Sequence, residues 1–358
     1  FSQFTFYIIF KMATPFEAAK TNIASKLEAR KDLYLELLNY LDTEEDTEEK
    51  SNEKLDDFVA HFQKSQEGQT EDYNKVELDD LLRLISHLAA AHHRSQQFFP
   101  RIINLLDRIK DQISQCYTNE QLFNLFLHEE PIQFLLKDKG MLEFNSNTND
   151  IIASEDNKDV NLYHNPGITE GVEEYQRTGE NHNQLCQFIR LGKEGDFQQT
   201  IVNNNIPLNS KIEPSRFETN SFLLDNKRNP KEVTLLQYAA FCGISQSFRD
   251  YFYDNAQELF DQSLWEYIIC SRSDDFLQFM VKNDVGQPKD HFDKCFELAV
   301  TCHHSEFIEK LQNINVEVQV QPAENATDPP PPQKYSLDPL LRAAILAHNY
   351  DVISRKFN

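Results

Sequence analysis

Five segments in the C-terminal half of the chain share one pattern, in which a short apolar helix is followed by a polar turn and a second apolar helix. One position of the first helix is equivalent in all five and is occupied in turn by Phe188, Tyr238, Tyr267, Leu298 and Ala343. The two middle steps, 238 to 267 and 267 to 298, are 29 and 31 residues long. A period of about 30 residues is typical of stacked helical repeats. We therefore predict that residues 184–358 form a row of helix pairs that pack on one another.

The two longer steps in this pattern carry insertions, at residues 205–233 and 319–335. The second insertion contains QPAENATDPPPPQK, whose consecutive prolines cannot continue a helix and favour an extended spacer, so we expect a projecting loop. The last segment, LLRAAILAHNYDVISRKFN, is polar only at its end. Either the final helix is a terminal cap or the sequence is truncated; because a terminal repeat needs a polar outer face, we favour truncation.

The preceding part of the chain has helical periodicity of its own. ELDDLLRLISHLAAAHHR and FFPRIINLLDRIKDQI repeat apolar residues every three to four positions, which predicts amphipathic helices. We predict an N-terminal α-helical domain over residues 12–142 and a polar linker over residues 143–183, where Asn, Asp and Ser are frequent. Residues 1–11 precede Met12, and we expect them to be a non-native upstream extension.

The net charge of −23 restricts the kind of partner. A strongly acidic chain repels a phosphate backbone, so we expect no nucleic-acid binding, whereas a basic protein partner is favoured. No segment approaches the roughly 20 apolar residues that span a bilayer, so we expect no membrane association. The six cysteines lack the spacing of a zinc site, and we interpret them as buried thiols in a reducing, cytoplasmic compartment.

Two clusters have the residue types of a metal or catalytic site. Residues 302–304 are Cys-His-His, but adjacent helical residues point about 100° apart, so we expect no metal there. Residues 92–94 are His-His-Arg and could bind an anion, although cations at a helix C-terminus also cap its carbonyl groups, which we favour. Common hydrolase, phosphate-loop and dinucleotide-binding motifs are absent. We therefore predict no enzymatic activity, no catalytic residue, no metal and no cofactor.

The segment TLLQYAAFCG, Thr234–Gly243, resembles the ankyrin-repeat signature T-P-L-H-x-A-A-x-x-G. Leu235 stands where proline is usual and Gln237 where histidine is usual, but Thr234 can still cap the helix. The two alanines are small enough for neighbouring helices to approach closely, and the final glycine suits a turn that requires positive φ. We expect structural roles in the repeat for Thr234, Leu236, Ala239, Ala240, Gly243 and, as part of the core between repeats, Trp265.

Other segments extend the resemblance: SHLAAAHHRSQQFFPRI, TNEQLFNLFLHEEPIQFLL, IPLNSKIEPSRFETNSFLL, SLWEYIICS and CFELAVTCHHSEFIEKL. Together they make most of residues 76–358, apart from the linker, similar to divergent ankyrin-repeat proteins of the type abundant in protists such as trichomonads. The resemblance implies an all-α protein with an N-terminal helical domain followed by an irregular ankyrin-like helical-repeat solenoid. It also implies protein binding without chemistry.

In ankyrin-like stacking, the first helix of each repeat lines the concave side. Matching the motif position by position places the protein-binding candidates there: Tyr238, Phe241, Tyr267, Ser271 and Thr301. Large aromatic side chains on such a face suit a binding hot spot. Alternatively, they fill gaps between irregular repeats. Both interpretations stay open for Phe241, and we favour exposure for the two tyrosines.

These observations favour a non-enzymatic scaffold or adaptor that binds a protein partner through the repeat surface. The alternative is a structural protein that self-associates through its N-terminal domain. Sedimentation of residues 12–142 distinguishes them, because a stable dimer supports self-association and a monomer supports the adaptor.

Overall fold

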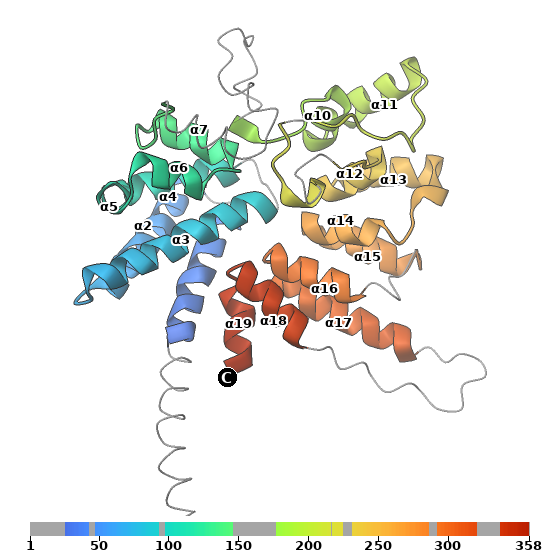
Figure 1. The fold of residues 1–358 in the computed structure, drawn as a ribbon. Coiled ribbons are helices and arrows are strands. Elements are labelled where there is room, and N and C mark those ends of the chain that lie inside the picture. Colours follow the sequence, from blue (N-terminus) through green and yellow to red (C-terminus); the bar gives the residue numbers. More distant parts are fainter. Residues whose placement is uncertain are drawn as a thin grey trace, which may run out of the picture.

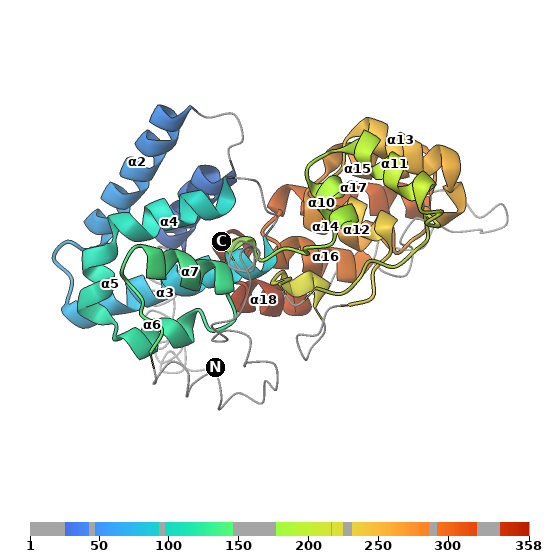
Figure 2. The same cartoon turned by 90° about the horizontal axis from the view of Figure 1, so that it is seen from above.

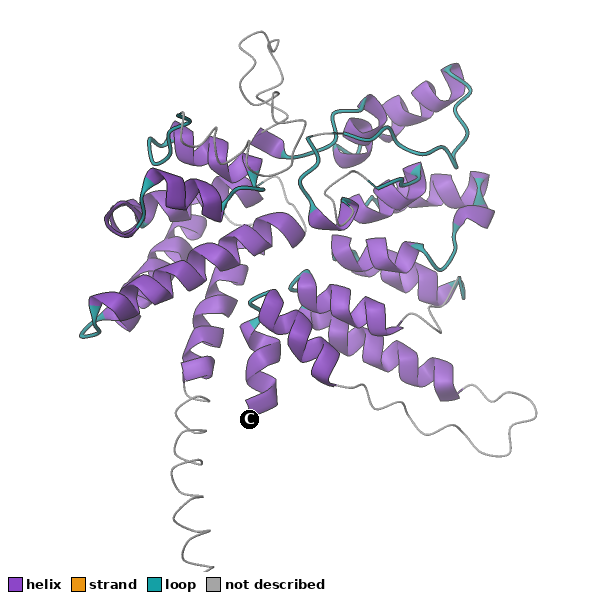
Figure 3. Ribbon diagram, in the orientation of Figure 1, coloured by secondary structure: helices purple, strands orange, loops and turns teal. Residues whose placement is uncertain are grey.

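The computed structural model describes residues 26–42, 47–92, 97–145, 177–215, 217–224, 231–285, 292–320 and 337–357. Within these ranges the regular elements are helices, and the only extended pairing is one isolated bridge between Lys211 and Thr234. The predicted all-α class is therefore confirmed (Figure 3). The helices form two units, an N-terminal unit up to residue 145 and a helix row from residue 177 onward, which lie side by side (Figures 1 and 2).

The N-terminal unit packs its helices around one apolar core. Threonines begin three of these helices, because Thr47, Thr70 and Thr118 each accept a hydrogen bond from a backbone N–H of the first turn. Thr118 and Gln121 form a complete capping box. The helices are residues 26–42, α2 (Glu48–Gln66), α3 (Glu71–Ala91), α4 (Phe98–Arg108), α5 (Lys110–Cys116), α6 (Asn119–Leu125) and α7 (Glu130–Asp138).

The helix row consists, over the described residues, of five helix pairs that follow one another in space as in sequence (Figure 1). The first helix of each pair packs against the first helix of the next, and one apolar core runs through all of them. The pairs are α10 (Gln184–Arg190) with α11 (Glu194–Asn203), α12 (Leu235–Cys242) with α13 (Gln246–Asn255), α14 (Leu264–Ser271) with α15 (Asp274–Lys282), α16 (Phe292–Thr301) with α17 (Ser305–Val320), and α18 (Leu337–Leu346) with α19 (Tyr350–Phe357).

The turn between the two helices of every pair contains one residue in the left-handed region. These residues are Gly192, Gly243, Arg272, His303 and His348, with φ between 54° and 67°. Such a residue just after a helix lets the chain reverse while its N–H groups bond to the last free carbonyls. Gly243 has the positive φ that its place in the motif predicts. In each of the next three pairs the two helices are connected through Arg or His, for which this conformation is unfavourable.

Two residues after these turns connect one pair to the pair before it. His304 donates from Nδ1 to the carbonyl oxygen of Ile269, at 2.8 Å. Asn349 donates from Nδ2 to the carbonyl oxygen of Val300, at 2.9 Å. Both carbonyls lie near the C-terminus of a first helix, and each also accepts the N–H of the residue three positions on, Arg272 or His303, at 3.2 Å. The side chains thus add a second hydrogen bond to these carbonyls and join the start of α17 to α14 and the start of α19 to α16.

The ankyrin-like segment begins with a complete capping box. Thr234 Oγ1 accepts from the N–H of Gln237 at 3.2 Å, and Gln237 Oε1 accepts from the N–H of Thr234 at 2.9 Å. Gln237 also donates to Ser263 Oγ at 3.0 Å, which links α12 to the start of α14. Leu236, Ala239 and Ala240 are buried between neighbouring first helices, in line with their expected structural roles.

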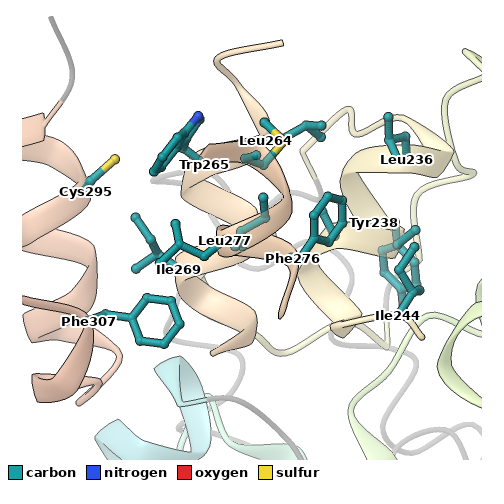
Figure 4. Packing of buried hydrophobic residues seen from close by; sticks show 14 of the residues in the cluster. Leu236, Tyr238, Ile244, Leu264, Trp265, Ile269, Phe276, Leu277, Cys295 and Phe307 are labelled. Carbon is teal, nitrogen blue, oxygen red and sulfur yellow. The ribbon is translucent and has the colours of Figure 1, made fainter. Parts of the chain in front are cut away.

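Trp265 is fully buried between consecutive pairs, as predicted, beside Leu264 and Ile269 (Figure 4). Its Nε1 donates to the carbonyl oxygen of Val285 at 3.4 Å, so the indole is satisfied without water.

The first insertion packs along the helix row. The N–H of Ile212 donates to the carbonyl of Val233, and that of Leu235 donates to the carbonyl of Ser210. Its residues 221–223 form the short 3-10 helix η2 (Ser221–Leu223), which also contacts α3 of the N-terminal unit. In the second insertion, residues 319 and 320 are the end of α17, and residues 321–335 lie outside the described ranges, as do residues 1–11.

Candidate functional site

Tyr238 is buried inside the helix row and cannot be touched by a partner (Figure 4). Our expectation of exposure is wrong for this residue, because α10 and α14 cover α12 on both sides. The Tyr238 hydroxyl accepts a hydrogen bond of 2.6 Å from Arg190 Nη1, so its polar end is satisfied within the chain. Tyr238 is therefore a core residue that fixes the packing of α10 on α12.

Phe241 and Tyr267 are half-buried, and a third aromatic residue covers them in part. Phe222 of η2 stacks on Phe241, with ring centroids 6.1 Å apart, and meets Tyr267 edge to face at 5.0 Å. Lys231 Nζ lies 4.9 Å from the Phe222 ring centroid. We call Phe222, Phe241 and Tyr267 the aromatic patch. Phe222 is half-buried too, so the patch has contact with solvent although its members support one another.

The Tyr267 hydroxyl keeps its proton over the physiological range. Burial, together with the nearby acidic groups Glu266 and Cys270, raises the pKa of Tyr267 to about 12. The phenol can therefore donate a hydrogen bond to a partner but cannot act as a general base near neutral pH. This chemistry suits recognition better than catalysis.

Ser271 and Thr301 use their hydroxyl groups within their own helices. Ser271 Oγ donates to the carbonyl of Ile268 at 2.9 Å, and Thr301 Oγ1 donates to the carbonyl of Glu297 at 2.8 Å. The backbone carbonyl of Thr301 accepts from His87 Nε2 at 3.1 Å, so Thr301 lies at the contact with the N-terminal unit. The structure therefore does not join these two residues to the aromatic patch as one polar site.

A second region of interest is the junction, which we define as the contact of the helix over residues 26–42 and α3 with the turns after α14, α16 and α18. His92, at the end of α3, is fully buried there. Its Nδ1 lies 2.6 Å from the carbonyl oxygen of Cys302, and its Nε2 lies 2.7 Å from Asp42 Oδ1. The two ring nitrogens of His92 thus face one acceptor on the helix row and one on its own unit.

Asp42 connects both units through charged groups. Besides His92, it accepts from Arg272 Nη1 at 2.5 Å through Oδ2. Arg272 Nε in turn donates to Glu306 at the start of α17. The carboxylate of Asp42 thus lies between the imidazole of His92 and the guanidinium of Arg272, and hydrogen bonds to a charged group are the stronger kind.

His303 lies at the centre of the junction and is buried. Its Nδ1 is 2.8 Å from the hydroxyl oxygen of Tyr34, which comes from the helix over residues 26–42. Its Nε2 is buried without a hydrogen-bond partner. Burial, reinforced by the electrostatic effect of the nearby His87, His92 and His348, lowers the pKa of His303 well below its ordinary value. The ring is therefore neutral at physiological pH.

The Cys-His-His triplet at residues 302–304 forms the turn between α16 and α17 rather than part of a helix as expected, and its three side chains have different partners. Cys302 Sγ lies 3.6 Å from Cys270 Sγ, His303 points to Tyr34, and His304 bonds to the carbonyl of Ile269. Among the described residues, no group of three or more His, Cys, Asp and Glu side chains is arranged to hold a metal ion.

The His-His-Arg cluster at residues 92–94 is described only at His92, since residues 93 and 94 lie outside the described ranges. The ring nitrogens of His92 bond to Asp42 and to the backbone of Cys302. These two contacts of the His92 side chain are thus with Asp42 of its own unit and with the Cys302 carbonyl of the helix row, and not with the carbonyl groups at the end of α3 as expected.

A small cleft of about 40 Å³ lies between the helix over residues 26–42, α2, α3 and α19. Its lining is mainly apolar, with Arg30 paired to Glu77 at 2.6 Å and to Asp80 at 2.9 Å. A space of this size holds a few water molecules, and its charged groups already pair with one another. It gives no sign of a substrate site.

Reasoning from the sequence misses Phe222, Tyr34 and Asp42. Phe222 lies in an insertion without repeat periodicity, and no local signal places its ring over two first helices. Tyr34 and Asp42 lie more than 200 residues before their partners, His303 and Arg272. Only the packing of the two units brings them together.

No family model, curated protein or solved structure matches this chain. Within the described part of the chain, no helix has both the length and the apolar character needed to cross a bilayer.

Proposed function

We propose that the protein is a non-enzymatic scaffold or adaptor that binds a protein partner through the surface of an ankyrin-like helix row. The aromatic patch is the observation that carries this proposal. Phe222, Phe241 and Tyr267 come from three separate segments and meet on the side formed by the first helices. Half-buried aromatic groups held by their neighbours lose little freedom when a partner covers them, which favours affinity.

The architecture supports the ankyrin-like character of the row. Consecutive pairs pack through their first helices, the helix turn in each pair uses a left-handed residue, and the Thr234–Gln237 capping box starts the motif helix. In a row of this kind each pair buries its apolar face against the next one. A partner can therefore bind only to the surface that remains exposed to solvent.

The charges near the aromatic patch indicate what the partner presents. Glu266, next to Tyr267, pairs with Lys294 at 2.6 Å, and Lys231 lies over Phe222. The whole chain carries a net charge of −23, which accelerates encounter with a basic partner. We propose a partner with an apolar anchor for the patch and basic residues around it.

The test compares Tyr267→Ala with Tyr253→Ala in the full chain. Partners are captured from cell extract by the wild-type protein, identified, purified and titrated by calorimetry. Tyr267→Ala is expected to weaken binding by about thirtyfold, or about 2 kcal/mol, because a hot-spot aromatic is removed.

Tyr253 is the matched control because it is also a half-buried tyrosine, but it lies on the second helix α13 and packs against Phe260 and Phe279. Its replacement leaves affinity unchanged if the first-helix face binds. Equal affinity of wild type and Tyr267→Ala, with both folded, places the partner elsewhere and refutes the aromatic patch as its site.

Self-association through the N-terminal unit is the second candidate. One face of this unit, formed by the helix over residues 26–42 and the end of α3, already packs on the helix row. Sedimentation of the full chain tests it: a monomer at micromolar concentration favours the adaptor, and a dimer favours self-association.

A further inference from the structure

Histidines gather at the junction. Among the histidines that the structure describes, five lie at the junction or beside it: His87, His92, His303, His304 and His348. The ring centroids of His87 and His303 are 5.3 Å apart, and those of His92 and His303 are 6.2 Å apart. Imidazoles at such distances repel one another when they are charged, especially where water is excluded.

His303 is the residue that an added proton would disturb most. The ring is buried, its Nδ1 is engaged with the Tyr34 hydroxyl and its Nε2 makes no hydrogen bond. An added hydrogen would therefore meet no hydrogen-bond acceptor at Nε2, or would take the place of a hydrogen that Tyr34 donates to Nδ1. Its backbone has φ 63°, so the residue is held in an unfavourable conformation by its surroundings. A proton on this ring would add an unpaired charge to a buried site, which is strongly unfavourable.

The groups around His303 and His348 come from every element of the junction. Facing them are Tyr34 and Asp42 from the first described helix, His87 and His92 from α3, Arg272 from the turn after α14, His304 and Glu306 at the start of α17, and Asp351 from α19. His348 in addition faces Arg30, Asp79, Asp80 and Arg83.

The carboxylates in this set are already engaged with cations. Asp42 bonds to His92 and Arg272, and Asp351 pairs with Arg355 at 2.8 Å. Glu306 pairs with Arg272. A new charge on His303 would therefore lie among the imidazoles of His87 and His92, whereas the nearby carboxylates are engaged with other partners.

We propose that the junction is an acid-sensitive contact, which holds the N-terminal unit on the helix row while His87, His303 and His348 are neutral and releases it when they take up protons. Release separates the two units while each keeps its own apolar core. Because η2 contacts α3, it also uncovers the edge of the aromatic patch that faces the N-terminal unit.

The lowered pKa values of three histidines determine whether acid strengthens or weakens closure. Burial is the main cause that lowers the pKa of His87, His303 and His348 in the closed form. The closed form thus binds these protons more weakly than the open form, in which an exposed histidine titrates near pH 6.5. Closure is fully stable above that pH and weakens as the pH falls below it.

Small-angle scattering of the full chain between pH 7.5 and 5.0 tests the proposal, with circular dichroism at each pH. The radius of gyration is expected to rise below about pH 6.5 while helicity is retained. Consider a histidine that is neutral in the closed form but titrates near pH 6.5 in the open form. Each such histidine lowers the ratio of closed to open molecules about tenfold at pH 5.5, relative to neutral pH. A constant radius over this range, or loss of helicity together with the rise, overturns the proposal.

The key variant is His303→Asn, because asparagine tolerates positive φ and does not titrate. We expect His303→Asn to shift the opening transition to lower pH. We expect the same shift from His87→Gln, a change within α3 where the backbone is helical. His61→Asn is the matched control, since His61 is exposed and pairs with Glu36 away from the junction. An opening curve unchanged in both junction variants, or shifted as much by His61→Asn, contradicts the assignment.

Discussion

At the scale of single residues, the left-handed turn positions are of two kinds, glycines and residues with a side chain. Gly192 connects the two helices of the first pair and Gly243 those of the second pair, and both adopt positive φ without a steric penalty. Arg272 and His303 adopt it at a cost of about 1 to 2 kcal/mol each. Both make contacts with the N-terminal unit, through Asp42 and Tyr34. We infer that these contacts offset the strain, so the unfavourable residues stand where the two units meet.

Trp265 gives the sharpest stability prediction at this scale. Trp265→Ala removes a fully buried indole from the core between consecutive pairs, leaving a cavity that close neighbours cannot refill. We expect the free energy of unfolding to fall by about 3 to 5 kcal/mol, measured by urea denaturation. Trp265→Phe retains most of the apolar contact and should lose clearly less. Equal stability of wild type and Trp265→Ala would mean that the indole is exposed.

At the scale of elements, the helices themselves are largely readable from local sequence. Thr234 begins a helix where its motif predicts. Two further local signals lie at helix starts, since Thr118 caps α6 and Pro131 lies in the first turn of α7. Caps and periodicity act over a few residues, so no tertiary information is needed to find them. The insertion at residues 205–233 is different, because its packing on α10, α12 and α3 depends on surfaces that exist only after folding.

The capping box of α12 can be tested directly. Thr234→Ala removes the side-chain acceptor for the N–H of Gln237 and leaves that donor unsatisfied at the helix start. We expect a loss of about 0.5 to 2 kcal/mol in the free energy of unfolding, from denaturant titration. Thr234→Ser keeps the hydroxyl and serves as control. A similar loss in both variants would assign the effect to the methyl group rather than to the cap.

At the scale of the whole molecule, the two units are held together by few but strong polar contacts. Asp42 accepts hydrogen bonds from His92 of its own unit and from Arg272 of the helix row. Tyr34, His87 and His92 add contacts to the turn at residues 301–303. Because the units have separate apolar cores, the junction can open without unfolding either of them.

Asp42→Asn tests this reading of the junction. The amide keeps the shape of the side chain but loses the charge that lies between His92 and Arg272, so closure should weaken by about 1.5 to 3 kcal/mol. Hydrogen exchange should accelerate at the end of α3 and in the turn after α16, with little change in the interior of α12. Glu36→Gln is the control, because the Glu36–His61 pair is exposed and contributes about 0 to 1 kcal/mol at most. Unchanged exchange at both sites would contradict the role of Asp42.

The sequence by itself determined the helical class, the places where many helices begin, the pairing of helices in the C-terminal half and the burial of Trp265. These features depend on periodicity, caps and side-chain size, which are local properties. Only the tertiary structure decided that Tyr238 is core, that Phe222 joins Phe241 and Tyr267, and that Tyr34 and Asp42 meet the turns of the helix row. Those contacts join residues that are far apart in the chain, and their position follows from how whole units pack.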